Sequence, residues 1–161
     1  GGRMSAPALD RAGILARVPH QGAMCLWDQV DAWDATRIRL RAWNHADPAH
    51  PLRADGRLHA LALCEYGAQA MAVHGGLLAA RSGAAAAPGV LVALREVELA
   101  VVRIDDLPGA LEGEAELLAA GTGSQQYAFR ILHGGRVVAS GRAAAILAAA
   151  PESPSAVLAP R

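Results

Sequence analysis

The chain contains, at residues 58–80, the stretch LHALALCEYGAQAMAVHGGLLAA, in which Glu65 is the only charged residue. Apolar side chains cover nearly the whole circumference of such a helix, which is typical of a helix that is buried on all sides. We expect close packing of another backbone at Gly67, because a glycine inside a helix costs about 1 kcal/mol against alanine. Gly75 and Gly76 are expected to end or loosen the helix.

The segments on both sides of this helix have strand patterns. An apolar run precedes it, followed by a stretch in which arginines alternate with apolar residues. Four more apolar or alternating stretches follow it, and a tight hairpin is expected at residues 133–135. The predicted elements are a short helix at 12–18, strands at 24–30, 36–43, 90–104, 110–120, 124–132 and 136–147, and a loop at 44–57.

This order of elements predicts an α+β fold in which an antiparallel sheet wraps around one long buried central helix. A single sheet covers only part of such a helix, so a second copy of the protein is expected against it. The length of 161 residues fits one domain. We expect this domain to span residues 11–147, between a flexible leader at 1–10 and a flexible tail at 148–161.

Composition excludes several classes of partner. Fifteen acidic residues balance 15 basic ones, all of them arginine, and no basic stripe stands out, so neither nucleic acid nor a membrane is an expected partner. The longest uncharged runs are too short to span a membrane. Cys25 and Cys64 lie in apolar contexts without CxxC spacing, and we interpret them as small buried residues. A reducing, cytoplasmic setting is therefore expected.

Glu65 is the first candidate for chemistry. A carboxylate in a buried helix loses solvation, so its pKa is expected to rise unless it is paired, and the protonated acid could then give a proton to a leaving hydroxyl. Gln69 lies one turn further along the same face and could orient the carboxyl. The alternatives are an ion pair with an arginine of the sheet, or a helix whose edge reaches solvent.

His50 is the second candidate, because its loop directly precedes the helix and its ring could face the helix start; the alternative is a histidine at the surface of a loop. The helix N-terminus around residues 57–60 has unpaired amides that could hold a polarised carbonyl. His45, His59 and His74 are further candidate site residues. Because the chain has no HxH or HxxxH pair, we expect no metal site, and no cofactor is implied.

Two stretches resemble a known family. Residues 18–30, VPHQGAMCLWDQV, resemble the opening segment of the 3-hydroxyacyl-(acyl-carrier-protein) dehydratases. His50-Pro51, followed by CEYGAQA at residues 64–70, resembles the catalytic histidine loop of that family and its Glu-x-x-x-Gln helix. The resemblance covers residues 12–147 and implies the hotdog fold, a dimer, and elimination of water from a 3-hydroxyacyl thioester.

The resemblance also implies roles for single residues. His50 would remove the α-proton, and Glu65 would protonate the departing hydroxyl with support from Gln69. An amide near Ala60 would stabilise the enolate-like oxygen, and the histidine and the acid of one site would come from different protomers. The substrate-binding residues expected around this site are His59, Ala60, Ala68 and Ala72, the last two because small side chains leave room for an acyl chain, although they could equally serve tight packing.

The chain departs from the family pattern in three ways. The usual His-Phe-Pro-Gly loop is His-Pro-Leu-Arg at residues 50–53, and the Pro-Gly that opens the family's helix is replaced by His59-Ala60. The interval from the histidine to the acid is also one residue longer than usual. In these departures the chain resembles the accessory dehydratase-like proteins of aryl-polyene and related polyketide clusters.

The sequence therefore predicts dehydration of 3-hydroxyacyl thioesters to trans-2-enoyl thioesters in fatty acid or polyketide-type synthesis. The expected partners are an acyl carrier protein or an acyl-CoA substrate, and a second subunit that is either identical or a related dehydratase. Two alternatives remain open. One is a hotdog acyl thioesterase, and the other is a non-catalytic partner subunit of a sister dehydratase.

Overall fold

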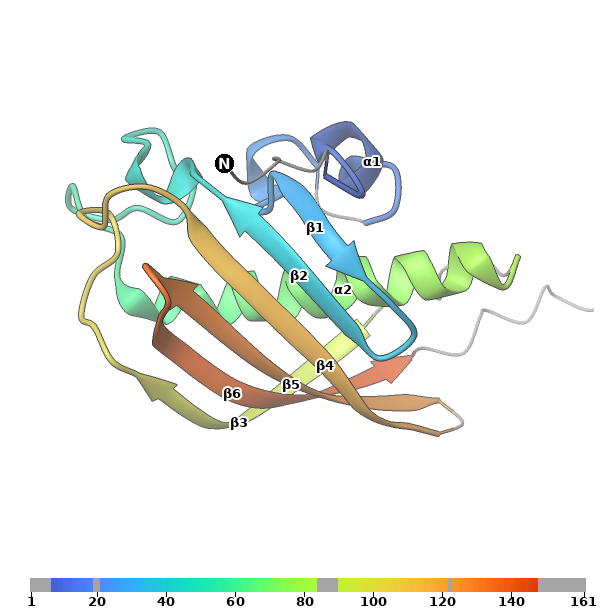
Figure 1. The fold of residues 1–161 in the computed structure, drawn as a ribbon. Coiled ribbons are helices and arrows are strands. Elements are labelled where there is room, and N and C mark those ends of the chain that lie inside the picture. Colours follow the sequence, from blue (N-terminus) through green and yellow to red (C-terminus); the bar gives the residue numbers. More distant parts are fainter. Residues whose placement is uncertain (1–6, 19–20, 84–89, 122, 148–161) are drawn as a thin grey trace, which may run out of the picture.

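The computed structural model describes residues 7–18, 21–83, 90–121 and 123–147, and its elements follow the predicted order (Figure 1). The helices and 3₁₀-helices are α1 (Arg11–Leu15), η1 (Gly22–Met24), η2 (Asn44–Ala46), η3 (Ala60–Ala62) and α2 (Leu63–Arg81). The strands are β1 (Gln29–Trp33), β2 (Arg37–Ala42), β3 (Val90–Leu99), β4 (Leu111–Gly121), β5 (Ser124–His133) and β6 (Arg136–Leu147).

All strands belong to one six-stranded antiparallel sheet with the order β1-β2-β4-β5-β6-β3. The sheet curls around α2, which crosses its concave side (Figure 1). Buried residues of α2 such as Leu63, Tyr66 and Leu77 join the core with inward-facing residues of the sheet. The predicted α+β fold, with a sheet wrapped around one long helix, is therefore confirmed.

Oppositely charged residues face each other between β2 and β4. Arg37 lies opposite Glu116, Arg39 opposite Glu114 and Arg41 opposite Glu112, all on the outer face of the sheet. Their nearest charged atoms are 3.5, 4.0 and 3.9 Å apart, respectively. The residues between them face the core, as the alternation in residues 36–43 predicts.

Two predicted strands are too long. The strand predicted at 24–30 begins only at Gln29, because η1 precedes it and the backbone of Leu26 is bonded by side chains instead of by a neighbouring strand. The strand predicted at 90–104 ends at Leu99. Beyond it the chain pairs with the start of the helical region, where the Ala60 amide donates to the carbonyl of Val102 at 2.9 Å.

The long helix begins later than predicted and does not end at its glycines. His59 precedes η3, and α2 proper begins at Leu63 and continues through Gly75 and Gly76 to Arg81. Within the described residues, no helix is long and apolar enough to cross a membrane.

The termini of the predicted domain are partly described. Residues 1–6 of the expected leader and the whole expected tail, 148–161, lie outside the described residues. The described end of the expected leader is bonded to the domain. Leu9 exchanges two backbone hydrogen bonds with Val30, and the Asp10 carboxylate caps α1 by accepting from the Gly13 amide at 2.9 Å.

Close packing does explain Gly67, but its neighbour is a side chain and not a backbone. A Cβ atom at Gly67 would lie 2.6 Å from the ring of Phe129, and one at Gly141 would meet the same ring at 2.8 Å. The Phe129 ring thus occupies the space that two glycines leave on α2 and β6. At Gly76 the neighbour is a backbone, because a Cβ there would lie 2.7 Å from the carbonyl oxygen of Arg17.

We expect Gly67→Ala to lower the free energy of unfolding by about 1–3 kcal/mol, because the added methyl overpacks the core against the Phe129 ring. Gly75→Ala is the matched control in the same helix, since its Cβ would meet only the Gln125 side chain at 3.9 Å. That variant should gain up to about 1 kcal/mol of helix propensity. Urea unfolding of both variants measures the difference, and equal stability of the two would contradict the packing argument.

Candidate active site

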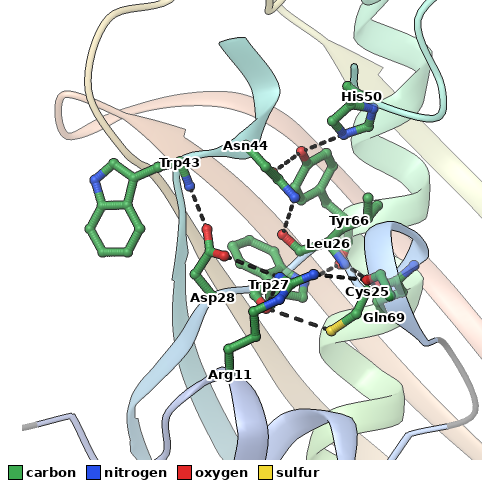
Figure 2. A network of polar contacts seen from close by, with 11 residues as sticks. Arg11, Cys25, Leu26, Trp27, Asp28, Trp43, Asn44, His50, Tyr66 and Gln69 are labelled. Atoms are coloured by element: carbon green, nitrogen blue, oxygen red, sulfur yellow. Dashed lines mark hydrogen bonds and ion pairs between the residues drawn. The ribbon is translucent and has the colours of Figure 1, made fainter. Parts of the chain in front are cut away.

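Two segments converge on the N-terminal half of α2, where the predicted site residues lie. One is the stretch between η1 and β1, and the other is the loop that follows β2 (Figure 2). Their polar groups meet in a buried network around Tyr66 and Gln69 of α2. The site is therefore built from three parts of the chain that are distant in sequence.

A chain of hydrogen bonds, which we call the His50 relay, joins these parts (Figure 2). The Leu52 amide donates to Nδ1 of His50 at 3.1 Å, and Nε2 of the same ring lies 3.0 Å from the Tyr66 hydroxyl. That hydroxyl donates to Oδ1 of Asn44 at 2.6 Å, and Nδ2 of Asn44 donates to the Leu26 carbonyl at 3.0 Å.

The two ends of the His50 relay determine where its protons lie. A backbone amide can only donate and a backbone carbonyl can only accept, so Leu52 and Leu26 give the relay one direction. Nδ1 of His50 is then an acceptor, and in the neutral ring Nε2 carries the proton and donates it to Tyr66. Burial lowers the pKa of His50 and so favours this neutral ring.

Gln69 attaches the η1–β1 segment to the helix. Its Oε1 accepts from the Leu26 amide and its Nε2 donates to the Met24 carbonyl, both at 2.8 Å, and the side chain is only 2% exposed. Among the described residues Gln69 has no hydrogen bond to Glu65. Gln69 therefore holds the backbone of the η1–β1 segment and does not orient the Glu65 carboxyl, as its spacing suggested.

Glu65 lies on the side of α2 that the sheet leaves uncovered. It is half-buried, as are Ala68, Ala72 and Gly75 along the same side, and it has no hydrogen-bond or ion-pair partner within the described residues. The sheet of one chain therefore encloses only part of the circumference of α2, as the sequence predicts for a single sheet. The alternative ion pair with an arginine of the sheet is not formed either.

A second uncovered surface lies at the edge of the sheet. Among the residues that the structure describes, β3 pairs only with β6, and the hydrogen-bonding groups on its other side have no strand partner there. Residues 93–98 of β3 are all exposed, including the apolar side chains of Leu94 and Val97. An edge strand of this kind is a common place for another chain to add to a sheet.

The region of His59 and Ala60 differs from the expected anion site. The Ala60 amide donates to the Val102 carbonyl, and the Leu61 amide donates to Nδ1 of the exposed His59 ring at 3.0 Å. The amide expected near Ala60 to stabilise an oxyanion is therefore already bonded. Ala60 is the first residue of η3, which leads directly into α2.

Two buried histidines, His74 and His45, bond the backbone outside this site. His74 is fully buried, its Nε2 donates to the Asp34 carbonyl and its Nδ1 accepts from the Tyr127 hydroxyl, both at 2.8 Å. His45 is also buried and bonds the Leu107 carbonyl through Nε2 at 2.8 Å. In the described part of the chain, no three His, Cys, Asp or Glu side chains form a group that could hold a metal ion.

The cysteines are both free thiols, as expected, although only Cys25 is fully buried and Cys64 is half-buried beside Glu65. Burial raises the pKa of both thiols.

A small open pocket of about 270 Å³ lies beside the His50 loop, with Arg11, Asp28 and Asp47 among its lining residues. Arg11 and Asp28 form an ion pair at 3.1 Å.

Sequence reasoning missed Asn44 and Tyr66, which connect His50 to the rest of the site. Tyr66 directly follows Glu65 but is fully buried, and its hydroxyl lies between His50 and Asn44 (Figure 2). A tyrosine and an asparagine bordering apolar stretches are a signal, because a buried hydroxyl or amide needs partners. The sequence does not say which partners these are.

A family model described as ApeP-like, ApeP dehydratase, matches residues 13–158. The chain belongs to the ApeP-like dehydratase family. This confirms the resemblance to a divergent group of dehydratases, and the match extends beyond the predicted domain end at residue 147. No curated protein matches the chain significantly.

Solved structures support the fold. A chain of the dehydratase heterocomplex ApeI:P from Xenorhabdus doucetiae is 20% identical, with a TM-score of 0.76 over 90% of this chain and 93% of that one. AziG from S. sahachiroi is 18% identical, with a TM-score of 0.54 over 75% of this chain and 91% of that one. A thioesterase family protein from Silicibacter pomeroyi is 18% identical, with a TM-score of 0.55 over 83% and 93%. The chain has the hotdog fold that these proteins share, and the predicted fold is confirmed.

We expect the protein to lose stability as the pH falls below about 6.5, because burial lowers the pKa of His45, His50 and His74 below the ordinary value of 6.5. In this range the unfolded chain binds more protons than the folded one, so stability is complete above about pH 6.5 and decreases toward the folded pKa values. Each histidine adds a slope of at most about 1.4 kcal/mol per pH unit.

Urea unfolding at several pH values measures this slope. His74→Gln is the matched variant, because its amide can still donate to the Asp34 carbonyl but cannot titrate. Its stability should depend less steeply on pH than that of the wild type. Superimposable pH profiles for the two proteins would show that His74 does not contribute.

Proposed function

We propose that this chain is a subunit of a dehydratase that converts 3-hydroxyacyl thioesters to trans-2-enoyl thioesters in fatty acid or polyketide-type synthesis. The observation that carries the proposal is the position of Glu65. It has a half-buried carboxyl without a partner among the described residues, on the uncovered side of α2 and next to the small residues Ala68 and Ala72. Membership of the ApeP-like dehydratase family supports the reaction class.

The chemistry assigned to Glu65 is proton donation. In the dehydration a base takes the proton from C2, and the electron pair of that C–H bond becomes the C2=C3 double bond. The C3–O bond breaks with its electron pair on oxygen, and the protonated Glu65 supplies the proton with which the hydroxyl leaves as water.

Small residues beside Glu65 suit an acyl chain. Ala68 and Ala72 follow it by one and two turns on the same side of α2, and Gly75 continues the line. Side chains of this size leave space along the helix when another surface closes over it. We assign Ala68 and Ala72 to the wall of the acyl site, and the carrier of the thioester to either an acyl carrier protein or CoA.

The second surface belongs, in this proposal, to a related dehydratase subunit. The uncovered side of α2 and the free edge of β3 are the two faces that a second hotdog subunit would cover. The structure of the ApeI:P dehydratase heterocomplex, which has a similar chain, supports a heterodimer over a homodimer.

A non-catalytic role is the second candidate function. The observation that favours it is the His50 ring, since both of its nitrogens already have partners. A chain that only completes a sister dehydratase would not need Glu65 as a proton donor. Substitution of Glu65 therefore separates the two functions.

We expect Glu65→Gln to lower kcat at least about 100-fold, because general acid catalysis contributes factors of that size. The enzyme is the complex that co-purifies with a tagged copy of this chain, and the substrates are 3-hydroxybutyryl-CoA and the same acyl group on a carrier protein. Formation of the conjugated enoyl thioester is followed by absorbance. Glu116→Gln, on the outer face of the sheet beside Arg37, is the control and should retain activity.

Wild-type activity no higher than that of Glu65→Gln would contradict the proposal. In that case, activity lost only with the partner subunit's own acid would favour the non-catalytic role. Release of free thiol without enoyl formation would instead indicate a thioesterase.

A further inference from the structure

We propose that His45 is a positioning residue whose action depends on pH. Its neutral ring holds the loop that carries His50 against the loop between β3 and β4, and a second proton on the ring releases that loop. The consequence for catalysis rests on the proposed dehydratase function, whereas the movement of the loop does not. His45 lies in η2, directly after Asn44 of the His50 relay.

The His45 ring has one bonded nitrogen and one nitrogen without a partner. The ring is fully buried, and its Nε2 lies 2.8 Å from the Leu107 carbonyl oxygen. Because a carbonyl can only accept, Nε2 carries the proton of the neutral ring. Nδ1 is then unprotonated, and it is buried without a hydrogen-bond partner among the described residues. A second proton would therefore have to bind at a nitrogen that faces the protein interior.

The loop between β3 and β4 is a junction of several segments. The Leu107 carbonyl accepts from His45, and the next carbonyl accepts from Nε2 of His133 at 2.6 Å. The Asp105 carboxylate of this loop accepts from the Leu58 amide at 2.9 Å, shortly before η3. His45 thus joins η2 to a part of the chain that also holds the start of the helical region.

Hydrogen bonds continue the connection from η2 to the His50 loop. Nη2 of Arg53 donates to the Ala46 carbonyl at 3.0 Å, and the His50 amide donates to the Asp47 carbonyl at 3.0 Å. On the other side of His45, the Asn44 side chain belongs to the His50 relay. A displacement of η2 therefore moves the backbone that carries His50 and a member of the relay together.

The positive groups near His45 disfavour a charged ring. Charged forms of the His133 and His50 rings would repel it. Burial is the main cause that lowers the pKa of His45, the bond to Leu107 opposes this shift, and His133 adds to it. Arg53, which bonds the carbonyl directly after His45, is a further positive group on this loop.

The carboxylates of the neighbouring loops are bonded elsewhere. Asp47 accepts from the Ala49 amide at 2.8 Å, and Asp105 and Asp106 pair with Arg103. Within the part of the chain that the structure describes, none of these carboxylates is a hydrogen-bond partner of Nδ1 of His45. A charged His45 ring is therefore stabilised only when it reaches water, which requires η2 or the β3–β4 loop to move.

The direction of the pH effect follows from these contacts. The closed arrangement favours the neutral ring, and an open arrangement with the ring in water favours the charged one. Below about pH 6.5, the ordinary pKa of histidine, the open arrangement therefore binds more protons. A fall in pH increases the fraction of open loops, by at most about tenfold per pH unit for a single proton.

Amide hydrogen exchange of the full-length chain, corrected for the intrinsic pH dependence of exchange, tests the opening without any need for activity. We expect the protection of the His50 and Arg53 amides to fall by up to about tenfold per pH unit below about pH 6.5. The protection of amides in the middle of α2, such as that of Ala70, should change less. Constant protection of the loop amides over this range would overturn the inference.

Two variants separate His45 from the other histidine on the same loop. His45→Gln can still donate to the Leu107 carbonyl but cannot titrate, so the protection of its His50 loop should be nearly independent of pH. His133→Gln is the matched control and should keep a pH dependence like that of the wild type. Equal pH dependence in the wild type and in His45→Gln would contradict the role of His45.

Ring-¹⁵N NMR of the wild type gives a second test that needs no variant to fold. We expect His45 to show a protonated Nε2 and an unprotonated Nδ1 above about pH 6.5, and the His50 loop amides to shift with the same midpoint as the protonation of His45. A proton on Nδ1 of the neutral ring, or loop shifts with a different midpoint, would overturn the inference.

Kinetics of the co-purified complex test the consequence for catalysis. We expect His45→Gln to keep kcat within about threefold of the wild type at about pH 8, because its side chain can still donate to Leu107. At about pH 6 it should lose less of its activity than the wild type. A purely structural role would lower kcat equally at both pH values, and that result would refute the catalytic consequence. Absence of enoyl formation by the wild-type complex would refute the proposed function, while hydrogen exchange would still decide whether His45 controls the loop.

Discussion

The backbone of Leu26 is buried outside the ladder of the sheet, and both of its polar groups are bonded by side chains. Gln69 takes the amide and Asn44 takes the carbonyl. A buried peptide group without partners costs as much as a lost hydrogen bond, so this attachment determines how the chain approaches α2. The direction of the His50 relay depends on the carbonyl of the same residue.

The order of elements could be predicted because it depends on patterns that a sequence displays directly. The alternation of arginines with apolar residues predicted β2 to within one residue at each end, and the long apolar stretch predicted α2. The apolar run at residues 24–30 was misleading, because apolar side chains show that a segment is buried but not whether strands or side chains bond its backbone. The start of α2 was misplaced because the segment before it, although apolar, forms η3 instead. Its first amide, that of Ala60, bonds the carbonyl of Val102, which is remote in sequence.

The candidate site was predictable in its residues more than in its contacts. Glu65 and His50 were found from an isolated charge and from a resemblance, and both lie at the N-terminal half of α2 or beside it. The partner of Gln69 was not predictable from spacing along the helix, because a buried amide bonds whichever backbone the tertiary structure brings to it. The tautomer of His50 depends on Leu26 and Leu52, and no motif includes them.

The charged pairs between β2 and β4 have a consequence for how the chain folds. Arg37 and Glu116 are 79 residues apart, so their strands must find each other after the whole α2 region has been synthesised. A slip of two residues would keep the apolar side chains facing inward but would leave an arginine and a glutamate unmatched at opposite ends of the ladder. The core opposes the same error, because Gly113, which lies opposite Leu40, leaves the space that the Trp27 ring occupies. The charged pairs on the outer face therefore favour the native register when β2 and β4 pair late in folding. Exchanging all three arginines with their three glutamates should preserve this preference.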